Sequence, residues 1–386
     1  MKSYALVALV AAAVTYLLTP AVRRFAVRGG AVAIPSDWKV HLEPTPEWGG
    51  LAIYGGLLAS MGVARFLPKF HELFRSSSEP IAVLAAATIV VIVGVIDDRR
   101  DLRASTKLAG QLLAGGVLVL GGVQIFYFWL PGLGVISLSS DLSAIVTVLW
   151  TIGVINGINM IDGLDGLAVG LTTICAAAFF IYAYSTSDLP TTAALLTAIV
   201  TGAGLGFIRH NFHPARIFMG DTGSMLLGII LASATISGFG RTTEPKFVDV
   251  AGFFVPVLIP VLVLAIPIAD AAWAVLRRVR GGRPVFHPDK EHIHHWVLEM
   301  APSYRRAVLV MYLWSALLAT ATLVLALGRG PLWRYVSGAV GTVWLATVVL
   351  LPRAMGRTRL AEQSVVADAH ATIVEFPRVG ESGPTV

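Results

Sequence analysis

Long apolar stretches separated by short polar loops run along almost the whole chain. Predominantly apolar stretches of about 17–23 residues are long enough to cross a bilayer as α-helices. We expect about eleven such spans, near residues 3–22, 48–66, 80–97, 107–123, 142–160, 166–184, 190–208, 222–239, 252–274, 307–327 and 332–351. A soluble globular protein does not have a composition of 56% hydrophobic and 13% charged residues. The sequence therefore predicts an all-α, polytopic integral membrane protein.

Basic residues are unevenly distributed between the loops that alternate along this pattern. If the N-terminus lies outside, 21 of the 29 Lys and Arg residues fall in the inner loops and the C-terminal tail. Cytoplasmic loops carry such an excess, so we expect the N-terminus outside and the C-terminus in the cytoplasm. The net charge of +6 arises largely in these loops, where it suits anionic lipid headgroups or anionic substrates and not nucleic acid.

A single membrane domain is expected over residues 1–351, because no loop is long enough to fold by itself. Residues 352–386 turn polar and contain several Gly and Pro residues, which predicts a disordered cytoplasmic tail. Gly202 and Gly206 predict close helix packing, with dimer formation as the alternative. The single cysteine, Cys175, excludes an internal disulfide and is expected to be a small core residue.

Acidic and histidine residues gather in four short motifs, all on the expected cytoplasmic side. A carboxylate at the centre of a membrane helix costs about 2.5–3.5 kcal/mol on insertion scales, so such residues indicate function. The motifs are Asp97-Asp98-Arg99-Arg100-Asp101, the stretch from Asn156 to Asp165, Gly220-Asp221-Thr222-Gly223, and His292-Ile293-His294-His295. Their convergence predicts a membrane enzyme with one catalytic site at the inner surface.

The first motif ends the predicted third span. Asp97 and Asp98 are followed by arginines and, at the start of the next span, by Lys107. Mg²⁺ prefers hard oxygen ligands and usually bridges one or two carboxylates to substrate phosphates. The motif therefore suggests a magnesium and phosphate site, with a solvated helix end of mixed charge as the alternative.

The second motif leaves the predicted fifth span. A spacing of three residues places Asn156, Asn159 and Asp162 on one face of a helix, near its inner end. Gly163 and Gly166 permit a tight turn and a close approach of the backbone to a ligand. A plain turn rich in Asp and Gly is the alternative, but it does not explain the two Asn residues that lead into it.

The third motif opens the predicted eighth span. Asp221 supplies a carboxylate, and its neighbours supply hydroxyls and backbone N–H groups at a helix N-terminus. This combination suits a cation bridged to phosphate. An N-cap aspartate is the alternative, and the two roles are compatible.

The fourth motif lies in a basic loop between residues 275 and 306. Arg and Lys residues surround His292, His294 and His295. Such a cluster matches a diphosphate whose negative charge must be held during transfer. A zinc site is the alternative, but the loop has no cysteine and zinc does not account for the basic residues.

Five segments together resemble the polyprenyl-phosphate N-acetylhexosamine-1-phosphate transferases, the glycosyltransferase 4 family. They are HLEPTPEWGG at 41–50, DDRRDL at 97–102, NGINMIDGLDGL at 156–167, NFHPARIFMGDTGSMLLG at 211–228 and HPDKEHIHH at 287–295. The His-Ile-His-His form is similar to the branch that uses UDP-N-acetylglucosamine. The branch that uses UDP-MurNAc-pentapeptide typically carries three adjacent histidines.

The resemblance implies a role for each matching residue. It makes Asp221 the main magnesium ligand with Asp97 beside it, and Mn²⁺ a substitute metal. The implied catalytic residues are Asp97, Asp98, Asp162 and Asp165. The implied substrate-binding residues are His41, Lys107, Asn156, Asn159, His292, His294 and His295. Two positions depart from the family pattern, because Glu47 and Trp296 stand where arginine is expected.

The implied reaction transfers N-acetylglucosamine 1-phosphate from UDP-N-acetylglucosamine to undecaprenyl or decaprenyl phosphate and releases UMP. It is the first membrane step of cell-envelope polysaccharide synthesis, and it implies a bacterial inner membrane, a surrounding lipid bilayer and a homodimer. The residues leave open whether Asp98 is a base or only positions the substrate. The alternatives are a UDP-MurNAc-pentapeptide donor, an ion-coupled transporter, which should place its acids near the bilayer midplane, and a CDP-alcohol phosphotransferase, whose Asp-Gly-x-x-Ala-Arg pattern is absent here.

Overall fold

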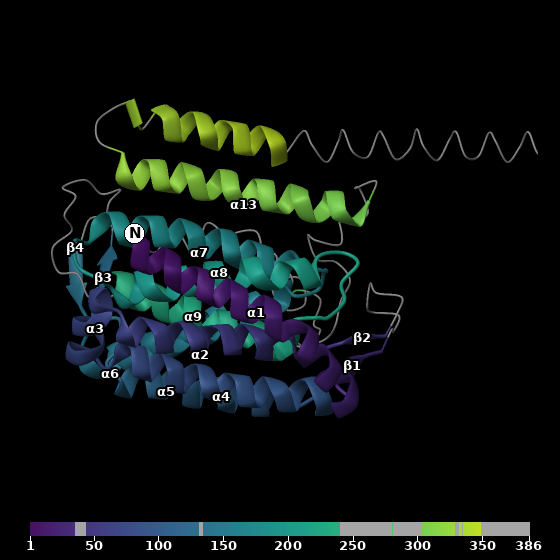
Figure 1. Ribbon diagram of the computed structural model, residues 1–386. Helices are drawn as coiled ribbons and strands as arrows, with labels where there is room; N and C mark the ends of the chain where they lie inside the picture. Colours follow the sequence, from purple (N-terminus) through teal and green to yellow (C-terminus); the bar gives the residue numbers. More distant parts are fainter. Residues whose placement is uncertain are drawn as a thin grey trace, which may run out of the picture.

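Long helices lie side by side in the structure, with a small hairpin at each end of the bundle (Figure 1). The computed structural model describes residues 1–34, 44–130, 134–239, 280, 303–328, 332–333 and 335–348. In chain order the elements are α1 (Lys2–Gly29), β1 (Val32–Ala33), β2 (Thr45–Pro46), α2 (Gly49–Phe66), η1 (Pro68–Phe70), α3 (His71–Ser76), α4 (Glu79–Arg100), α5 (Ala104–Leu120), β3 (Tyr127–Leu130), β4 (Gly134–Ser137), α6 (Ser140–Ile161), α7 (Leu167–Thr186), α8 (Thr192–Asn211), α9 (Gly220–Phe239), α13 (Tyr304–Leu327) and a helix over Tyr335–Val348.

Eight of the described helices are long and apolar enough to cross a membrane, and α5 and the helix over Tyr335–Val348 are shorter apolar helices. The predicted spans before residue 240, and those near 307–327 and 332–351, coincide with helices. The all-α, polytopic fold is thus confirmed. The span near 252–274 and the tail 352–386 lie outside the described residues. The orientation of the termini and the domain boundary at residue 351 stay predictions.

Local sequence signals set several helix ends. Ser139, Thr191 and Ser303 cap α6, α8 and α13, and each side chain accepts a hydrogen bond from the backbone N–H three residues ahead. α1 ends at Gly30, which adopts the left-handed conformation that glycine tolerates. These signals set where α6, α8 and α13 begin and where α1 stops.

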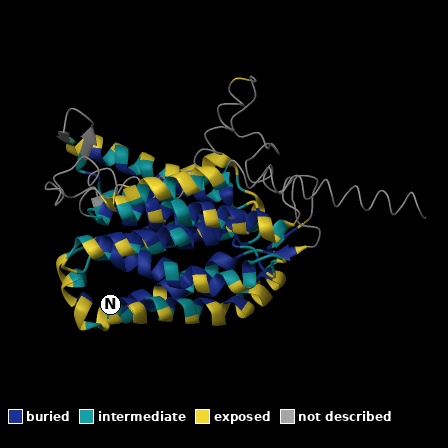
Figure 2. Ribbon diagram, turned by 90° about the horizontal axis from the view of Figure 1, so that it is seen from above, coloured by how far each residue is buried: buried dark blue, intermediate teal, exposed yellow. Residues whose placement is uncertain are grey.

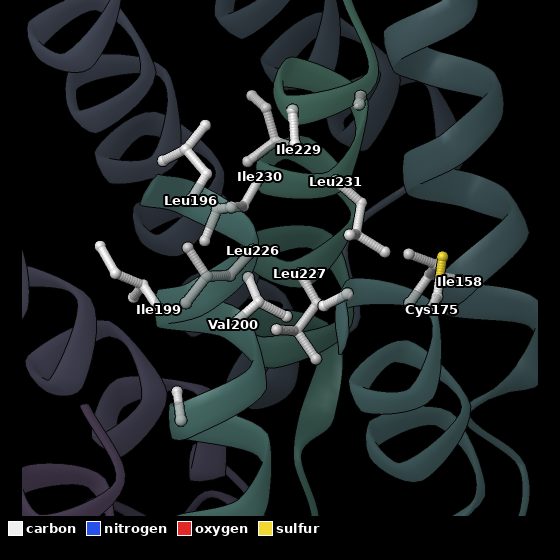
Figure 3. Close-up of a cluster of buried hydrophobic side chains, with 14 of the residues drawn as sticks. Ile158, Cys175, Leu196, Ile199, Val200, Leu226, Leu227, Ile229, Ile230 and Leu231 are labelled. Atoms are coloured by element: carbon white, nitrogen blue, oxygen red, sulfur yellow. The ribbon is translucent and has the colours of Figure 1, made fainter. Parts of the chain in front are cut away.

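α9 lies at the centre of the bundle, where it packs against α2, α4, α6, α7 and α8. Figure 3 shows its side chains Leu226 and Ile230 among Leu196 and Ile199 of α8, while Cys175 of α7 lies on the other side of the cluster. Cys175 is fully buried, so the prediction of a small core residue is confirmed. Because five helices pack against α9, the position of the residues at its start is fixed by these contacts.

Apolar side chains also cover the outer faces of the bundle. Figure 2 shows buried residues along the inner faces and exposed residues along the outer faces of the helices. Leu17 and Leu149 are among the large apolar residues that are mostly exposed. Such faces are expected where lipid chains surround the protein, because lipid tails are as apolar as leucine.

The two glycines of α8 bring it close to α1. A Cβ atom at Gly202 would lie 2.0 Å from the carbonyl oxygen of Ala8, and one at Gly206 would lie 2.3 Å from that of Ala12. The backbone of α1 therefore occupies the space that a side chain would need. Helix packing within the chain is thus confirmed as the role of the two glycines, and the homodimer stays a prediction.

The two antiparallel hairpins were not predicted from the sequence. In one, Val32 of β1 pairs with Pro46 of β2, and in the other β3 pairs with β4. The β1–β2 hairpin connects the end of α1 to the start of α2. Its Pro46 carbonyl accepts a hydrogen bond from the N–H of Phe218 at 2.8 Å. The hairpin therefore supports the segment that leads into α9.

Candidate active site

The N-terminus of α9 is capped by a carboxylate from another helix. Asp98, near the end of α4, accepts hydrogen bonds from the Asp221 N–H at 2.7 Å and from the Thr222 N–H at 3.2 Å and hydroxyl at 2.6 Å. Gly220 before them has a φ of 71°, and a Cβ atom there would lie 2.5 Å from an Asp98 oxygen. The N-cap reading of Asp221 is therefore wrong, because Asp221 lies in the first turn and Asp98 does the capping.

Asp97 and Asp221 share one positive charge. The Nζ atom of Lys107 lies 2.5 Å from Asp97 Oδ2 and 2.8 Å from Asp221 Oδ2. The Nδ2 atom of Asn159 donates a hydrogen bond to the other oxygen of Asp221 at 2.8 Å. The ends of α4, α5, α6 and α9 thus meet at one point. We call Asp97, Asp98, Lys107, Asn159 and Asp221 the acidic cluster.

Glycines let the start of α9 lie directly against its neighbours. The N–H groups of Gly49 and Gly50 at the start of α2 donate to the carbonyls of Phe218 and Met219, at 3.0 and 2.9 Å. A Cβ atom at Gly94 of α4 would lie 2.4 Å from the Cα atom of Thr222. Backbone therefore packs on backbone around the acidic cluster.

Asp162 follows the last residue of α6 and is half-buried. Burial raises the pKa of its carboxyl well above its usual range, and repulsion from Asp221 and Asp98 raises the pKa further. The negative charge of Glu47 acts in the same direction. Asp162 therefore belongs to the same electrostatic environment as the acidic cluster, and positive charge at the site would favour its ionised form.

Asp165 has a different set of partners. Its Oδ2 atom lies 2.8 Å from His213 Nδ1 and accepts a hydrogen bond from the Ala215 N–H at 3.0 Å. The Tyr304 hydroxyl accepts a hydrogen bond from the Asp165 N–H. The His213 ring stacks on the Tyr304 ring, with the two centroids 4.1 Å apart. Asp165 thus joins the α6–α7 turn to the segment before α9. Its predicted catalytic role stays a prediction, and its visible role is to hold that segment.

Asn156 pairs with a residue that the sequence reading missed. Its Nδ2 atom donates to Gln111 Oε1 at 2.7 Å, and Gln111 Nε2 donates back at 3.4 Å. Asn156 bonds to α5 and Asn159 bonds to α9, whereas Asp162, which the spacing placed on the same helix face, lies just beyond the last residue of α6. Gln111 follows Lys107 by four residues on α5, so a polar pair one turn apart in an apolar helix was the available signal.

The remaining predicted site residues lie outside the described residues. These are His41, His292, His294 and His295, together with Trp296. Tyr312 of α13 was also missed, and its hydroxyl donates to the Gly166 carbonyl in the α6–α7 turn. An aromatic residue in an apolar helix carries no sequence signal for such a contact.

The acidic cluster offers oxygen ligands for a divalent cation. Within the part of the chain that the structure describes, there is no group of three or more His, Cys, Asp and Glu residues arranged to hold a metal ion. Two carboxylate oxygens, from Asp97 and Asp221, nevertheless lie close enough to a common point to share the ammonium of Lys107. One or two carboxylates completed by substrate phosphates are the usual protein environment of Mg²⁺.

Comparisons with known proteins give a family match and several relatives. Residues 80–239 match the model of glycosyl transferase family 4. The chain is 42% identical over 329 residues to a decaprenyl-phosphate N-acetylglucosaminephosphotransferase of Mycobacterium leprae. This alignment covers 83% of each chain. It is 34% identical to a probable undecaprenyl-phosphate N-acetylglucosaminyl 1-phosphate transferase of Bacillus subtilis, over 80% of this chain and 81% of the relative. It is 29% identical to an undecaprenyl-phosphate alpha-N-acetylglucosaminyl 1-phosphate transferase of Escherichia coli, over 77% of each.

Proposed function

The chain belongs to glycosyl transferase family 4, and we propose that it transfers N-acetylglucosamine 1-phosphate from UDP-N-acetylglucosamine to a polyprenyl phosphate. The products are polyprenyl diphosphate N-acetylglucosamine and UMP. The names of the relatives, which include decaprenyl and undecaprenyl acceptors, support both the transferred group and the class of acceptor.

The observation that carries this proposal is the shared contact of Asp97 and Asp221 with Lys107 at the ends of four helices. A transfer between two phosphorylated substrates brings two anions together, and catalysis consists mainly of positioning and charge stabilisation. Within the acidic cluster, Lys107 supplies an ammonium group and Asp97 and Asp221 supply two carboxylates at the ends of apolar helices. A lipid phosphate reaches such a site with its chain still among the helices.

We propose Mg²⁺ as the cofactor, with Mn²⁺ as a substitute, held by Asp221 and Asp97. The bound metal supplies positive charge that offsets the repulsion between donor and acceptor phosphates. Lys107 would then turn from the carboxylates toward a substrate phosphate. Asn159, which already holds one oxygen of Asp221, keeps that carboxylate oriented.

The lipid phosphate needs little activation by a base. A phosphate monoester has its second pKa at about 6, so most of it is doubly ionised at neutral pH. We propose that one of its oxygens attacks the sugar-proximal phosphorus directly. The bond from that phosphorus to the bridging oxygen breaks, and UMP leaves with the electron pair. Asp98 is a positioning residue in this scheme, because both of its oxygens accept hydrogen bonds from the start of α9.

The setting that we propose is a bacterial inner membrane. Eight described helices that are long and apolar enough to cross a bilayer support a multi-pass membrane protein. With the inner loops in the cytoplasm, the acidic cluster lies on the side where UDP-sugars are made.

UMP release tests the proposal. Detergent-purified protein receives decaprenyl or undecaprenyl phosphate and one of three donors, UDP-N-acetylglucosamine, UDP-N-acetylgalactosamine or UDP-MurNAc-pentapeptide, each with Mg²⁺ or with EDTA. We expect UMP only with UDP-N-acetylglucosamine and only with metal. UMP release from only one of the other donors would overturn the proposal of UDP-N-acetylglucosamine as the donor. Undiminished UMP release in EDTA would overturn the proposal of a metal cofactor.

A further inference from the structure

A cavity of about 740 Å³ lies between α8, the segment that follows it and the start of α13. Small-molecule sites usually measure about 300–1,000 Å³, so this cavity is large enough for a ligand. Its wall contains three arginines, Arg209, Arg216 and Arg305, and apolar side chains that include Leu205 and Ile208. None of its lining residues belongs to the acidic cluster.

The cavity carries positive charge that the described residues do not balance. Among the residues that the structure describes, no acidic residue lines it, and none of its three arginines forms an ion pair. All three arginines are exposed at the surface. The planar fork of arginine matches phosphate, which it binds through two parallel hydrogen bonds. The charge therefore favours a ligand that carries phosphate.

The apolar wall indicates where the rest of such a ligand lies. Arg209 is in the last turn of α8, at the end of a helix long enough to span a membrane. Leu205 precedes it by one helical turn and is 59% exposed. A helix of this length that spans a membrane places Arg209 at the membrane edge and Leu205 beside the lipid chains. Basic pockets between membrane helices bind lipid headgroups in this arrangement.

We propose that this cavity binds the phosphate group of an anionic membrane phospholipid. We call it the arginine pocket and define it by Arg209, Arg216, Arg305, Leu205 and Ile208. The phosphate lies among the three guanidinium groups, and an acyl chain runs along Leu205 and Ile208. The leaflet is the one at the same end of the bundle as the acidic cluster, because Arg216 lies five residues before Asp221.

The arginine pocket is connected to the segment that positions α9. Arg305 Nε donates a hydrogen bond to the carbonyl of His213 at 3.0 Å, and His213 contacts Asp165 in the α6–α7 turn. The Arg216 N–H donates to the His210 carbonyl at 2.9 Å, and the chain then runs through Phe218 into α9. A bound phosphate offsets the repulsion between the arginines and so holds this segment in place. Turnover is expected to rise with the fraction of anionic lipid.

The binding test uses full-length protein in detergent without donor or acceptor, so its outcome does not depend on the proposed reaction. Native mass spectrometry measures the retention of added phosphatidylglycerol and phosphatidylcholine. We expect the double variant Arg209→Gln, Arg216→Gln to bind phosphatidylglycerol about tenfold more weakly or worse, because two charged hydrogen-bonding groups are lost. Arg306→Gln is the matched control, since Arg306 is exposed, follows Arg305 directly and lies outside the pocket.

Two further arms separate a lipid from free phosphate and from general charge. Leu205→Gln changes no charge and is expected to weaken phosphatidylglycerol binding as well. Inorganic phosphate at millimolar concentration is expected to leave phosphatidylglycerol bound. The proposal is overturned if the double variant retains phosphatidylglycerol as the wild type does. It is also overturned if Arg306→Gln weakens phosphatidylglycerol binding as much as the double variant does, or if inorganic phosphate displaces the lipid.

Discussion

The carboxylate of Asp98 accepts a hydrogen bond from the backbone N–H of Asp221 at 2.7 Å, so one acidic residue holds the backbone of another. The two residues are separated by 123 positions in the sequence. The N-terminus of a helix carries partial positive charge, which attracts the Asp98 carboxylate. The side chain of Asp221 remains directed at Lys107 and Asn159. The Asp98 carboxylate thus positions the start of α9, and the Asp221 carboxylate is free of that role and faces Lys107 and Asn159.

Asp221→Asn is expected to lower turnover by at least about a hundredfold while leaving the fold intact, because the variant keeps its shape and loses its charge. UMP release measures turnover, and tryptophan fluorescence during heating measures the unfolding temperature. Asp101→Asn, at the exposed end of the same α4 helix, is the control and should retain turnover. Near-normal UMP release by Asp221→Asn would remove Asp221 as the principal metal ligand.

The decreases in kcat/KM caused by Asp98→Asn and by Thr222→Val are expected to be non-additive. If Asp98 positions α9, removing its hydroxyl partner at Thr222 should itself lower kcat/KM, and the two changes should couple by more than about 0.5 kcal/mol. A double-mutant cycle on kcat/KM measures the coupling. A strictly additive result, with a pH–rate profile altered only by Asp98→Asn, would instead indicate that Asp98 is a base.

Gly94→Ala is expected to destabilise the protein by about 1–3 kcal/mol, because the added methyl group overlaps the backbone of Thr222. Gly116→Ala on α5 is the control, since no atom lies within 4 Å of the added Cβ. The control should gain stability, by about 0.4–1 kcal/mol, because alanine restricts the unfolded chain. Equal unfolding temperatures for the two variants would show that α4 and α9 are not in direct backbone contact.

Asp162→Asn is expected to raise the unfolding temperature of the metal-free protein at neutral and alkaline pH. The folded-state pKa of Asp162 is raised, so folding favours its protonated form, and that stability is lost as the pH rises through the folded-state pKa. Asparagine does not ionise and avoids this loss. The difference should shrink as the pH falls toward about 4, the ordinary pKa of aspartate. Melting curves in EDTA across this range measure it, and a difference independent of pH would contradict the assignment.

The membrane fold follows from single stretches of sequence, because helix length and apolar composition are local properties. The spans that end in Asp97 and begin near Asp221 were predicted from such stretches. The common side of their loops predicted that the two ends lie near each other, and the contacts of Asp97 and Asp221 with Lys107 now show where they meet. The clustering of motifs was therefore accessible to sequence reasoning.

The division of roles among the acids was not accessible in this way. Asp98 caps α9 and Asp165 binds the segment before it, although both have the same side chain as Asp221. Their roles depend on contacts between residues about 50 to 120 positions apart, which follow from tertiary packing and leave no periodic signal. The hairpin of β1 and β2 was missed because each of its strands has only two residues.

The fate of the two donor phosphates tests the central claim most directly. UDP-N-acetylglucosamine labelled with ³²P at the sugar-proximal phosphate is incubated with the protein, Mg²⁺ and polyprenyl phosphate, and the products are separated into lipid and aqueous fractions. Transfer of N-acetylglucosamine 1-phosphate predicts that the label moves into the lipid diphosphate while unlabelled UMP is released in equal amount. Label recovered in UDP, with only the sugar on the lipid, would show transfer of the sugar alone and would contradict the proposed reaction.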